Sequence, residues 1–287
     1  MSSTHRTGVS ARGAARENTL TAPTSGLAPG HVQANLIVLP SKPSHYAQDF
    51  RRLCLRNPVA LPLIAEGGYD SLKSHLPNLE HDEIIRTTPG FDLRRDVPKY
   101  TVYRDGKVVG EEVVQDIRAE WQDHVAFLTG SSFTFVTDLA KAGLAPRQPS
   151  APLYVATKKH LYPSGIFYDS PTVVSMRAYS AAEIGRVREI TAPFVATHGE
   201  PIDWGWGAVD RLGIEDINTP AYGDAPLTKD GKPFGDAAWT SEVVPVFWAS
   251  GVTALEAVKK AELEGTVMVN KPDYMLLLDC QVGDVKK

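Results

Sequence analysis

The sequence has little of several features that would assign it to a class at once. Only two of its 287 residues are cysteine, Cys54 and Cys280, so a disulfide-stapled scaffold is excluded and we expect reduced thiols in an intracellular protein. No apolar run reaches the roughly 18–20 residues that a helix needs to span a bilayer. The formal net charge of -4 gives no indication of nucleic-acid or membrane-surface binding.

The motifs that hold metals and nucleotides are also missing. Eight histidines are scattered without a His-Glu-x-x-His pattern, and there is no Cys-x-x-Cys pair, Gly-x-Gly-x-x-Gly string or P-loop. We therefore expect no metal and no cofactor. A Gly-x-Ser-x-Gly elbow is lacking too, which argues against covalent catalysis by a serine.

The first residues leave two alternatives open. Arg6, Arg12 and Arg16 lie in a Ser- and Thr-containing stretch without acids, a composition typical of mitochondrial transit peptides, but the stretch lacks a clear apolar face. We expect residues 1–20 to be a flexible lead whose later part packs on the domain. The expected location is the cytoplasm, with mitochondrial import as the alternative.

Most of the remaining chain has the pattern of alternating strands and helices. Residues 35–40 and 60–65 have the composition of buried strands, and Asp105-Gly106 predicts a tight hairpin. The spacing of apolar residues predicts a helix over 117–128, and Ser180 with Glu183 predicts a capping box that opens another. A chain with 43% hydrophobic and 22% charged residues is an ordinary globular one.

This pattern predicts an α/β fold of two intimately packed lobes. We expect a three-layer α/β sandwich lobe built from residues 21–98 and 190–287, and a smaller two-layer α+β lobe from residues 99–189. The cleft between the lobes is the expected site.

The most informative stretch runs from Val244 to Thr253. Its apolar run is short and rich in strand formers, so it predicts a buried strand that turns directly into a helix. Thr253 stands three residues before Glu256, a spacing that predicts a capping box. The free backbone N–H groups at such a helix start suit an anion or a carboxylate.

The same stretch resembles the signature of the D-glutamate cyclase-like proteins, a family of hydro-lyases, which carries Cys where this chain has Ser250. The resemblance covers about residues 22–279. It rests on further strings that stand here intact or nearly so: Gln33-Ala34-Asn35-Leu36, Arg56-Asn57-Pro58, Asp96-Val97-Pro98-Lys99-Tyr100, Val173-Val174-Ser175-Met176-Arg177, Thr197-His198-Gly199-Glu200-Pro201 and Gly223-Asp224-Ala225.

The chain departs from the family at polar positions. A Cys and a Glu of the family are Ser131 and Val136 here, and an Arg is Val155. Two His of the family are replaced by Asn270 and Tyr274. We interpret the chain as a relative whose site has been altered.

The resemblance implies a lyase that closes D-glutamate to 5-oxoproline with loss of water. That reaction needs a base, donors for an oxyanion and a cation or backbone N–H cluster for the second carboxylate. For catalysis we expect His198 and Glu200 as acid or base, and Arg177 as the carboxylate fork unless it forms a structural salt bridge. The expected substrate-binding residues are Gln33, Asn35, Ser131, Ser132, Ser175, Ser250, Thr253, Asn270 and Tyr274.

Two functions remain open at this stage. The first is a cofactor-independent lyase or cyclase acting on a small carboxylate- or amine-bearing substrate, with altered specificity and a role in specialised metabolism. The alternative is a catalytically silent family member that binds a ligand or partner, for which we expect a filled cleft around His198, Arg177 and Ser250. The expected partners are a small-molecule substrate and a second copy in a dimer, with no nucleic acid and no membrane.

Overall fold

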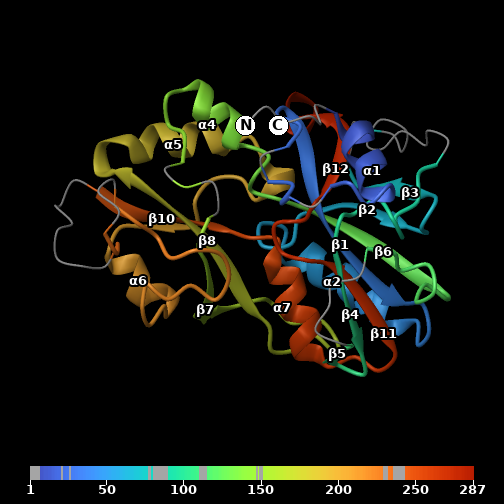
Figure 1. Cartoon of the computed structure of the whole chain (residues 1–287). Helices are drawn as coiled ribbons and strands as arrows, with labels where there is room; N and C mark the ends of the chain where they lie inside the picture. The colour runs from blue at the N-terminus through green and yellow to red at the C-terminus, as the bar shows by residue number, and fades with distance from the viewer. Residues whose placement is uncertain are drawn as a thin grey trace.

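The computed structural model describes residues 7–20, 22–25, 27–76, 79, 90–109, 115–146, 148, 151–228, 232–234 and 243–287. These residues form an α/β structure with two sheets that lie beside each other, the larger on the right and the smaller on the left in Figure 1. The expected α/β class and its two-lobed organisation are confirmed.

The larger sheet has the strand order β3-β2-β6-β1-β11-β4-β5, and β12 also pairs with β1. The bounds of its strands are β1 His31–Pro40, β2 Leu63–Gly67, β3 Leu72–Ser74, β4 Tyr100–Arg104, β5 Lys107–Val108, β6 His124–Gly130, β11 Thr266–Asn270 and β12 Leu276–Gln281. β1 is its central strand, because β6 pairs with one edge and both β11 and β12 with the other. A strand buried on both faces carries an almost continuous apolar run, as residues 36–40 do.

The smaller sheet has the order β7-β8-β10-β9. Its strands are β7 Leu153–His160, β8 Pro171–Ser180, β9 Asp203–Trp204 and β10 Val243–Ala249. β8 pairs antiparallel with the whole of β10 from Val174 to Ser180, with Ser175 opposite Trp248 and Arg177 opposite Val246. Residues two apart on a strand share a face, so Ser175 and Arg177 lie on the same side of this sheet.

Helices cover both sheets (Figure 1). Apolar residues of α2 (His45–Arg56) and α7 (Val252–Ala261) share one core cluster with Ile37 and Phe127 of the larger sheet. α6 (Gly207–Leu212) packs with Met176 and Phe247 of the smaller sheet. On the other side of that sheet, α4 (Val136–Lys141) and α5 (Ile184–Thr191) contribute to the cluster that contains Trp248. No helix among the described residues combines the length and the apolar character that crossing a membrane requires.

Residues 7–20, in the stretch where we expected a lead whose later part packs on the domain, contain a helix that does so. Helix α1 (Gly8–Arg16) begins at a Thr7–Ser10 capping box and packs on β12. Arg12 is buried, with Nη1 donating to the carbonyl of Leu277 (2.6 Å) and Nη2 to Asp279 (2.7 Å). Arg12, and Arg16 through its pair with Asp96, are therefore used in the fold, while Arg6 lies outside the described residues.

Sheet membership divides the chain differently from the lobes that we expected. The hairpin β4–β5 and strand β6 belong to the larger sheet, and β10 belongs to the smaller one. The reason is non-local pairing, because β4 pairs with β11, more than a hundred residues further along the chain.

The predicted helix over 117–128 was wrong. Its second half is strand β6, placed between β2 and β1. β6 is buried on both faces from Ala126 onward, so its sequence lacks the alternation that marks a strand. The capping box of Thr253 and Glu256 is also absent, because α7 begins at Val252, with Gly251 as the N-cap residue and no side-chain cap.

Candidate functional site

The two sheets meet where β6 and β10 end, and glycines make that meeting possible. A Cβ on Gly130 would lie 2.0 Å from the carbonyl oxygen of Ala196, and a Cβ on Gly251 would lie 1.8 Å from Nδ2 of Asn35. Asn35 in turn donates to the carbonyl of Gly130 (3.3 Å). The ends of β1, β6 and β10 and the segment before His198 are thus held against one another.

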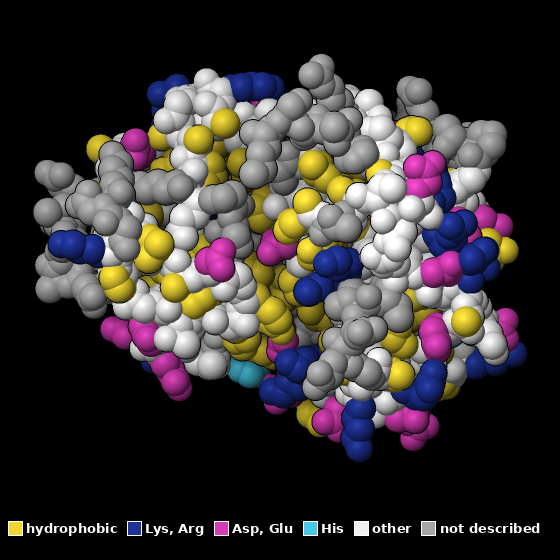
Figure 2. Space-filling view, in the orientation of Figure 1, with side chains coloured by type: hydrophobic (Ala, Val, Ile, Leu, Met, Phe, Trp, Pro, Cys, Tyr) yellow, Lys and Arg dark blue, Asp and Glu magenta, His cyan; other side chains and the backbone are white. Residues whose placement is uncertain are grey.

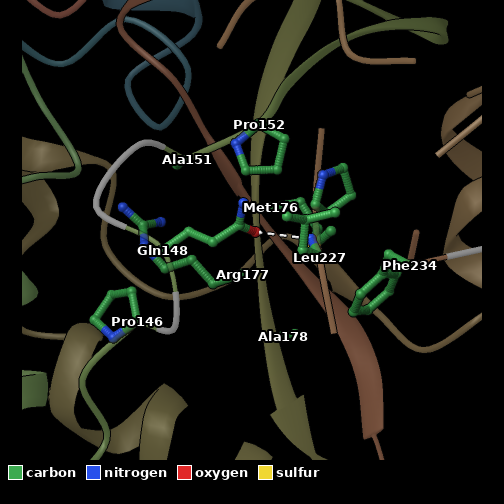
Figure 3. A pocket seen from close by; sticks show the side chains of 10 residues that line it. Pro146, Gln148, Ala151, Pro152, Met176, Arg177, Ala178, Leu227 and Phe234 are labelled. Atoms are coloured by element: carbon green, nitrogen blue, oxygen red, sulfur yellow. Dashed lines mark hydrogen bonds between the residues drawn. The ribbon is translucent and has the colours of Figure 1, made fainter. Parts of the chain in front are cut away.

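Arg177 extends from β8 into this junction. Its Nη1 lies 3.3 Å from Oγ of Ser175, and its Nη2 lies 3.3 Å from Oγ and 3.4 Å from the carbonyl of Ser132. The rings of Phe135 and Trp248 flank the guanidinium, with centroids 5.2 and 5.1 Å from Cζ. Figure 3 shows Arg177 on the opposite side of β8 from Met176 and Phe234.

The charge of Arg177 has no counter-ion in the described part of the chain. The side chain is buried, and neither its hydrogen bonds nor its ring contacts involve a carboxylate. Burial lowers its pKa to about 10, so it remains a cation at neutral pH. A buried, unpaired cation is costly in free energy, and an anion brought to it is held strongly.

His198 lies in the left-handed region of backbone space at the end of η2 (Val195–Thr197), with φ 85°. Its ring is buried, and Nδ1 lies 2.9 Å from the carbonyl oxygen of Val59. Because a carbonyl only accepts, Nδ1 carries the proton, and the neutral ring has a lone pair on Nε2.

The surroundings of His198 favour that neutral form. Burial lowers its pKa to about 4; the backbone carbonyls of Val59 and Gly130 act in the opposite direction, and the charge of Arg177 adds to the lowering. Nε2 is buried and has no hydrogen-bond partner among the described residues.

Other polar atoms near this junction are buried without a partner in the described residues. They are Oε1 of Gln33, Oγ1 of Thr129 and Nε1 of Trp248. Native proteins leave few such atoms unpaired, and Trp248, one of the three residues, contacts Arg177 through its ring. The position of Trp248 opposite Ser175 follows from the pairing of β8 with β10.

The structure therefore brings together several of the predicted site residues. The set comprises Gln33, Asn35, Ser131, Ser132, Ser175, Arg177, His198 and Ser250, all of them buried. Ser131 joins it through its N–H, which donates to the carbonyl of Gln33 (3.1 Å), and Ser250 through its N–H, which donates to Val173 (3.0 Å).

Other predicted residues have structural partners instead. Glu200 points to the surface and pairs with Arg188 (2.8 Å), so it does not reach the buried ring of His198. The hydroxyl of Thr253 both accepts from the N–H and donates to the carbonyl of Val173. Asn270 accepts from the N–H of Leu36 (2.8 Å), and the hydroxyl of Tyr274 lies 3.2 Å from Nζ of Lys99.

Two small cavities border this set of residues. One of about 20 Å³ is lined by Arg177 together with Gln148 and Phe234, and Figure 3 shows Gln148 bonded across it to Leu227. The other, of about 10 Å³, lies between Asn35, Gly251 and Asn270. On the outer surface, hydrophobic side chains follow a hollow between β7–β8 and α7 (Figure 2). Within the described ranges, no three His, Cys, Asp or Glu side chains gather as they would around a metal ion.

The site thus holds a buried cation and a neutral histidine, and comparison with known proteins shows the family of the chain. The family model described as D-glutamate cyclase matches residues 125–279. The chain belongs to this family, whose names support a lyase-type function.

The similarity to individual relatives extends over most of the chain. A protein of Rubrobacter xylanophilus named "Putative hydro-lyase" is 39% identical over 263 residues, which is 90% of this chain and 89% of the relative. One of the same description from Bordetella petrii is 40% identical over 276 residues, or 94% and 92% of the two chains. A solved nitrogen repressor-like protein of Methanococcus jannaschii covers 94% of this chain and 98% of its own, but with a TM-score of 0.31 and 10% identity it carries no argument.

Proposed function

We propose that this protein is a cofactor-independent lyase or cyclase that acts on a small molecule through a carboxylate held by Arg177. The observation that carries the proposal is the buried guanidinium without a counter-ion in the described residues. A carboxylate fits the planar donor edge of an arginine and would cancel the uncompensated charge.

His198 is the proposed proton acceptor. Its Nε2 is unprotonated and unpaired, but a pKa of about 4 makes it a weak base in the empty site. An anion on Arg177 would cancel the repulsion that Arg177 exerts on a protonated ring, so substrate binding would raise the basicity of His198 toward the range that proton transfer needs.

For a glutamate-like substrate the steps balance without a further reactant. The amine nitrogen attacks the distal carboxyl carbon, a C–N bond forms, and His198 takes a proton from the amine. The C–O bond of the tetrahedral intermediate then breaks as His198 returns this proton to the departing hydroxyl, which leaves as water. The free indole N–H of Trp248 is the proposed donor to the oxyanion.

Altered specificity is supported by the contacts of the residues that differ from those of the family. Asn270 and Tyr274, which replace two histidines, have hydrogen-bond partners in the fold. Ser131 and Ser250, which replace two cysteines, are buried beside the site and offer hydroxyls of ordinary acidity. We therefore propose a substrate that keeps the carboxylate and differs from D-glutamate elsewhere.

The silent family member is the second candidate, and the cavity volumes favour it. The spaces of about 20 and 10 Å³ beside Arg177 and Asn35 do not hold a molecule of glutamate's size. The lyase reading requires this junction to open when substrate enters.

The test is incubation of the purified protein with D-glutamate, following 5-oxoproline by chiral chromatography. Arg177→Met and His198→Asn variants serve as site controls, and Arg188→Met, which alters a surface arginine paired with Glu200, is the matched control. Turnover lost only in the two site variants supports the inherited reaction.

If the folded wild type shows no turnover, other amino dicarboxylates are assayed next, and the Ser131→Cys/Ser250→Cys double variant is assayed with D-glutamate. If no substrate turns over but glutarate binds to the wild type and not to Arg177→Met, the protein is a silent binder. If glutarate binds to neither the wild type nor Arg177→Met, the proposal fails.

A further inference from the structure

A separate pocket of about 330 Å³ lies in the smaller sheet where β7 and β10 end and β8 begins. It is formed by the chain after α2, by the end of β7 with the residues that follow it, and by single residues of β8, β10 and the turn near β9. We propose that this pocket binds an organic anion, a carboxylate or phosphate group on an apolar body. The proposal goes beyond the function proposed above, because Arg177, Ser132 and Ser175 do not line this pocket.

The charge of the pocket is positive. Arg56, Lys159 and His160 line it, and none of its described lining residues is acidic. Asp169, which pairs with His160 (3.0 Å), is itself paired with Lys260 (2.7 Å).

Asp203, the acid that interacts with Lys159, is likewise neutralised by another cation. Asp203 is paired with Arg211 (2.6 Å) and so is largely neutralised. Arg56 and Lys159 therefore present positive charge that an anion can meet.

The walls of the pocket are mostly apolar. Pro58, Val59, Leu161, Ile202 and Ala249 line it. Tyr162 lies at the rim with 69% of its surface exposed, so a flat apolar body entering the pocket has a ring to pack on. A few cations over an apolar cavity of this size are the usual features of a site for an organic acid.

Asn57 holds the pocket in shape. Its Oδ1 accepts from the N–H of Tyr162 (2.8 Å), and its Nδ2 donates to the carbonyls of Tyr162 (2.9 Å) and Leu53 (2.9 Å). From the sequence, Asn57 before Pro58 has a simpler explanation as the end of a helix. In the structure it joins the end of α2 to the segment after β7, so the two cationic walls stand at a fixed separation.

The pocket borders the candidate active site at one residue. Val59 lines it, and the carbonyl of Val59 is the acceptor for Nδ1 of His198. A ligand packed on Val59 will change the environment of that proton, which gives a local signal of occupancy.

The experiment is a titration of the wild-type protein with phenyl phosphate and with benzoate, each followed by calorimetry and by the NMR signal of the His198 Nδ1–H. Benzyl alcohol supplies the ring without the charge, while inorganic phosphate and acetate supply the charge without the ring. We expect the two aromatic anions to bind with a shift of the histidine signal, and the neutral and ring-free compounds to bind more weakly. Whichever aromatic anion binds more tightly identifies phosphate or carboxylate as the preferred group.

The variants place the site. The Arg56→Gln/Lys159→Gln double variant removes both rim charges and is expected to weaken binding by about tenfold or more. The matched control is Arg52→Gln/Lys158→Gln, since Arg52 is one turn earlier on α2 and Lys158 donates to the carbonyl of Asp210, and neither lines the pocket. Arg177→Met must also bind normally, which separates this result from failure of the proposed lyase function. Equal binding of benzyl alcohol, or unchanged affinity in the Arg56/Lys159 variant, would overturn the proposal.

Discussion

Nδ1 of His198 donates to the carbonyl of Val59 across 2.9 Å, and both groups are more than a hundred residues apart in the chain. This bond fixes the neutral tautomer of a ring that is buried beside Arg177. The pH dependence of stability follows from that arrangement.

The pKa of His198 is lowered in the folded protein to about 4 from 6.5, so the unfolded chain binds a proton between these values while the folded chain does not. Stability is therefore lost as the pH falls from 6.5 to 4, by about 3 kcal/mol for this group. Asp96 acts in the opposite sense: burial raises its pKa to about 6, so the folded chain takes up its proton first and gains stability over the same window. Urea unfolding of the wild type and of His198→Asn at pH 7 and pH 4.5 isolates the histidine; a constant difference between the two proteins would contradict the assignment.

Arg177→Met should make the empty protein more stable. The variant removes a buried charge that has no counter-ion in the described residues and places an apolar chain between Phe135 and Trp248. We expect a gain of about 1–3 kcal/mol in the free energy of unfolding, together with loss of glutarate binding beside His198. Arg177→Lys keeps the charge and should show no gain. A destabilised Met variant would mean that the guanidinium has an anionic partner in the fold.

Arg12 should be among the most sensitive positions outside the site. It is 1% exposed and bridges the carbonyl of Leu277 and the carboxylate of Asp279, with Asp96 3.8 Å from its Nε. Arg12→Met takes a cation away from two buried carboxylates, which costs about 3–5 kcal/mol. Arg118→Met, at an exposed pair with Asp116, is the control and should stay within about 0.5 kcal/mol. Thermal unfolding measures both; equal midpoints would show that α1 contributes nothing to stability.

Gly251→Ala tests the contact between the sheets. The new Cβ would overlap Nδ2 of Asn35, which donates to Gly130, so either the side chain or the strand end must shift. We expect a loss of about 1–3 kcal/mol. Gly185→Ala, in α5 with no atom near the new Cβ, should instead stabilise by about 0.5–1 kcal/mol because alanine favours a helix. Denaturant midpoints of both variants decide; a neutral Gly251→Ala would mean that the junction is loose.

Local chemistry made several elements of the fold predictable. The Asp105-Gly106 hairpin has the positive φ angles that its sequence requires, 49° and 74°. Ser180 and Glu183 form the predicted capping box, with Glu183 accepting from the N–H of Ser180 (2.8 Å). In both cases residues within four positions of each other determine the conformation.

The other elements could not be predicted from the sequence because they depend on pairing between distant segments. β6 lacks the alternation of a strand because both its faces are covered. The hydroxyl of Thr253 is hydrogen-bonded to Val173, eighty residues away, and does not cap its own helix. For the site, Ser175 and Arg177 lie two residues apart on one strand and therefore share a face of the sheet. Glu200 was assigned from closeness in sequence to His198, but a left-handed turn directs the two side chains apart, one to the core and one to Arg188.

The pairing of β1 with β12 has a consequence for how the protein is made. Gln33 lies opposite Leu277, so β1 meets this neighbour only after more than two hundred further residues have been synthesised. Until then this part of the apolar edge of β1 is open to other chains, and contacts of such sequence separation form slowly. The larger sheet is therefore completed only once β12 has left the ribosome, and nascent chains stalled before residue 276 should be clients of chaperones.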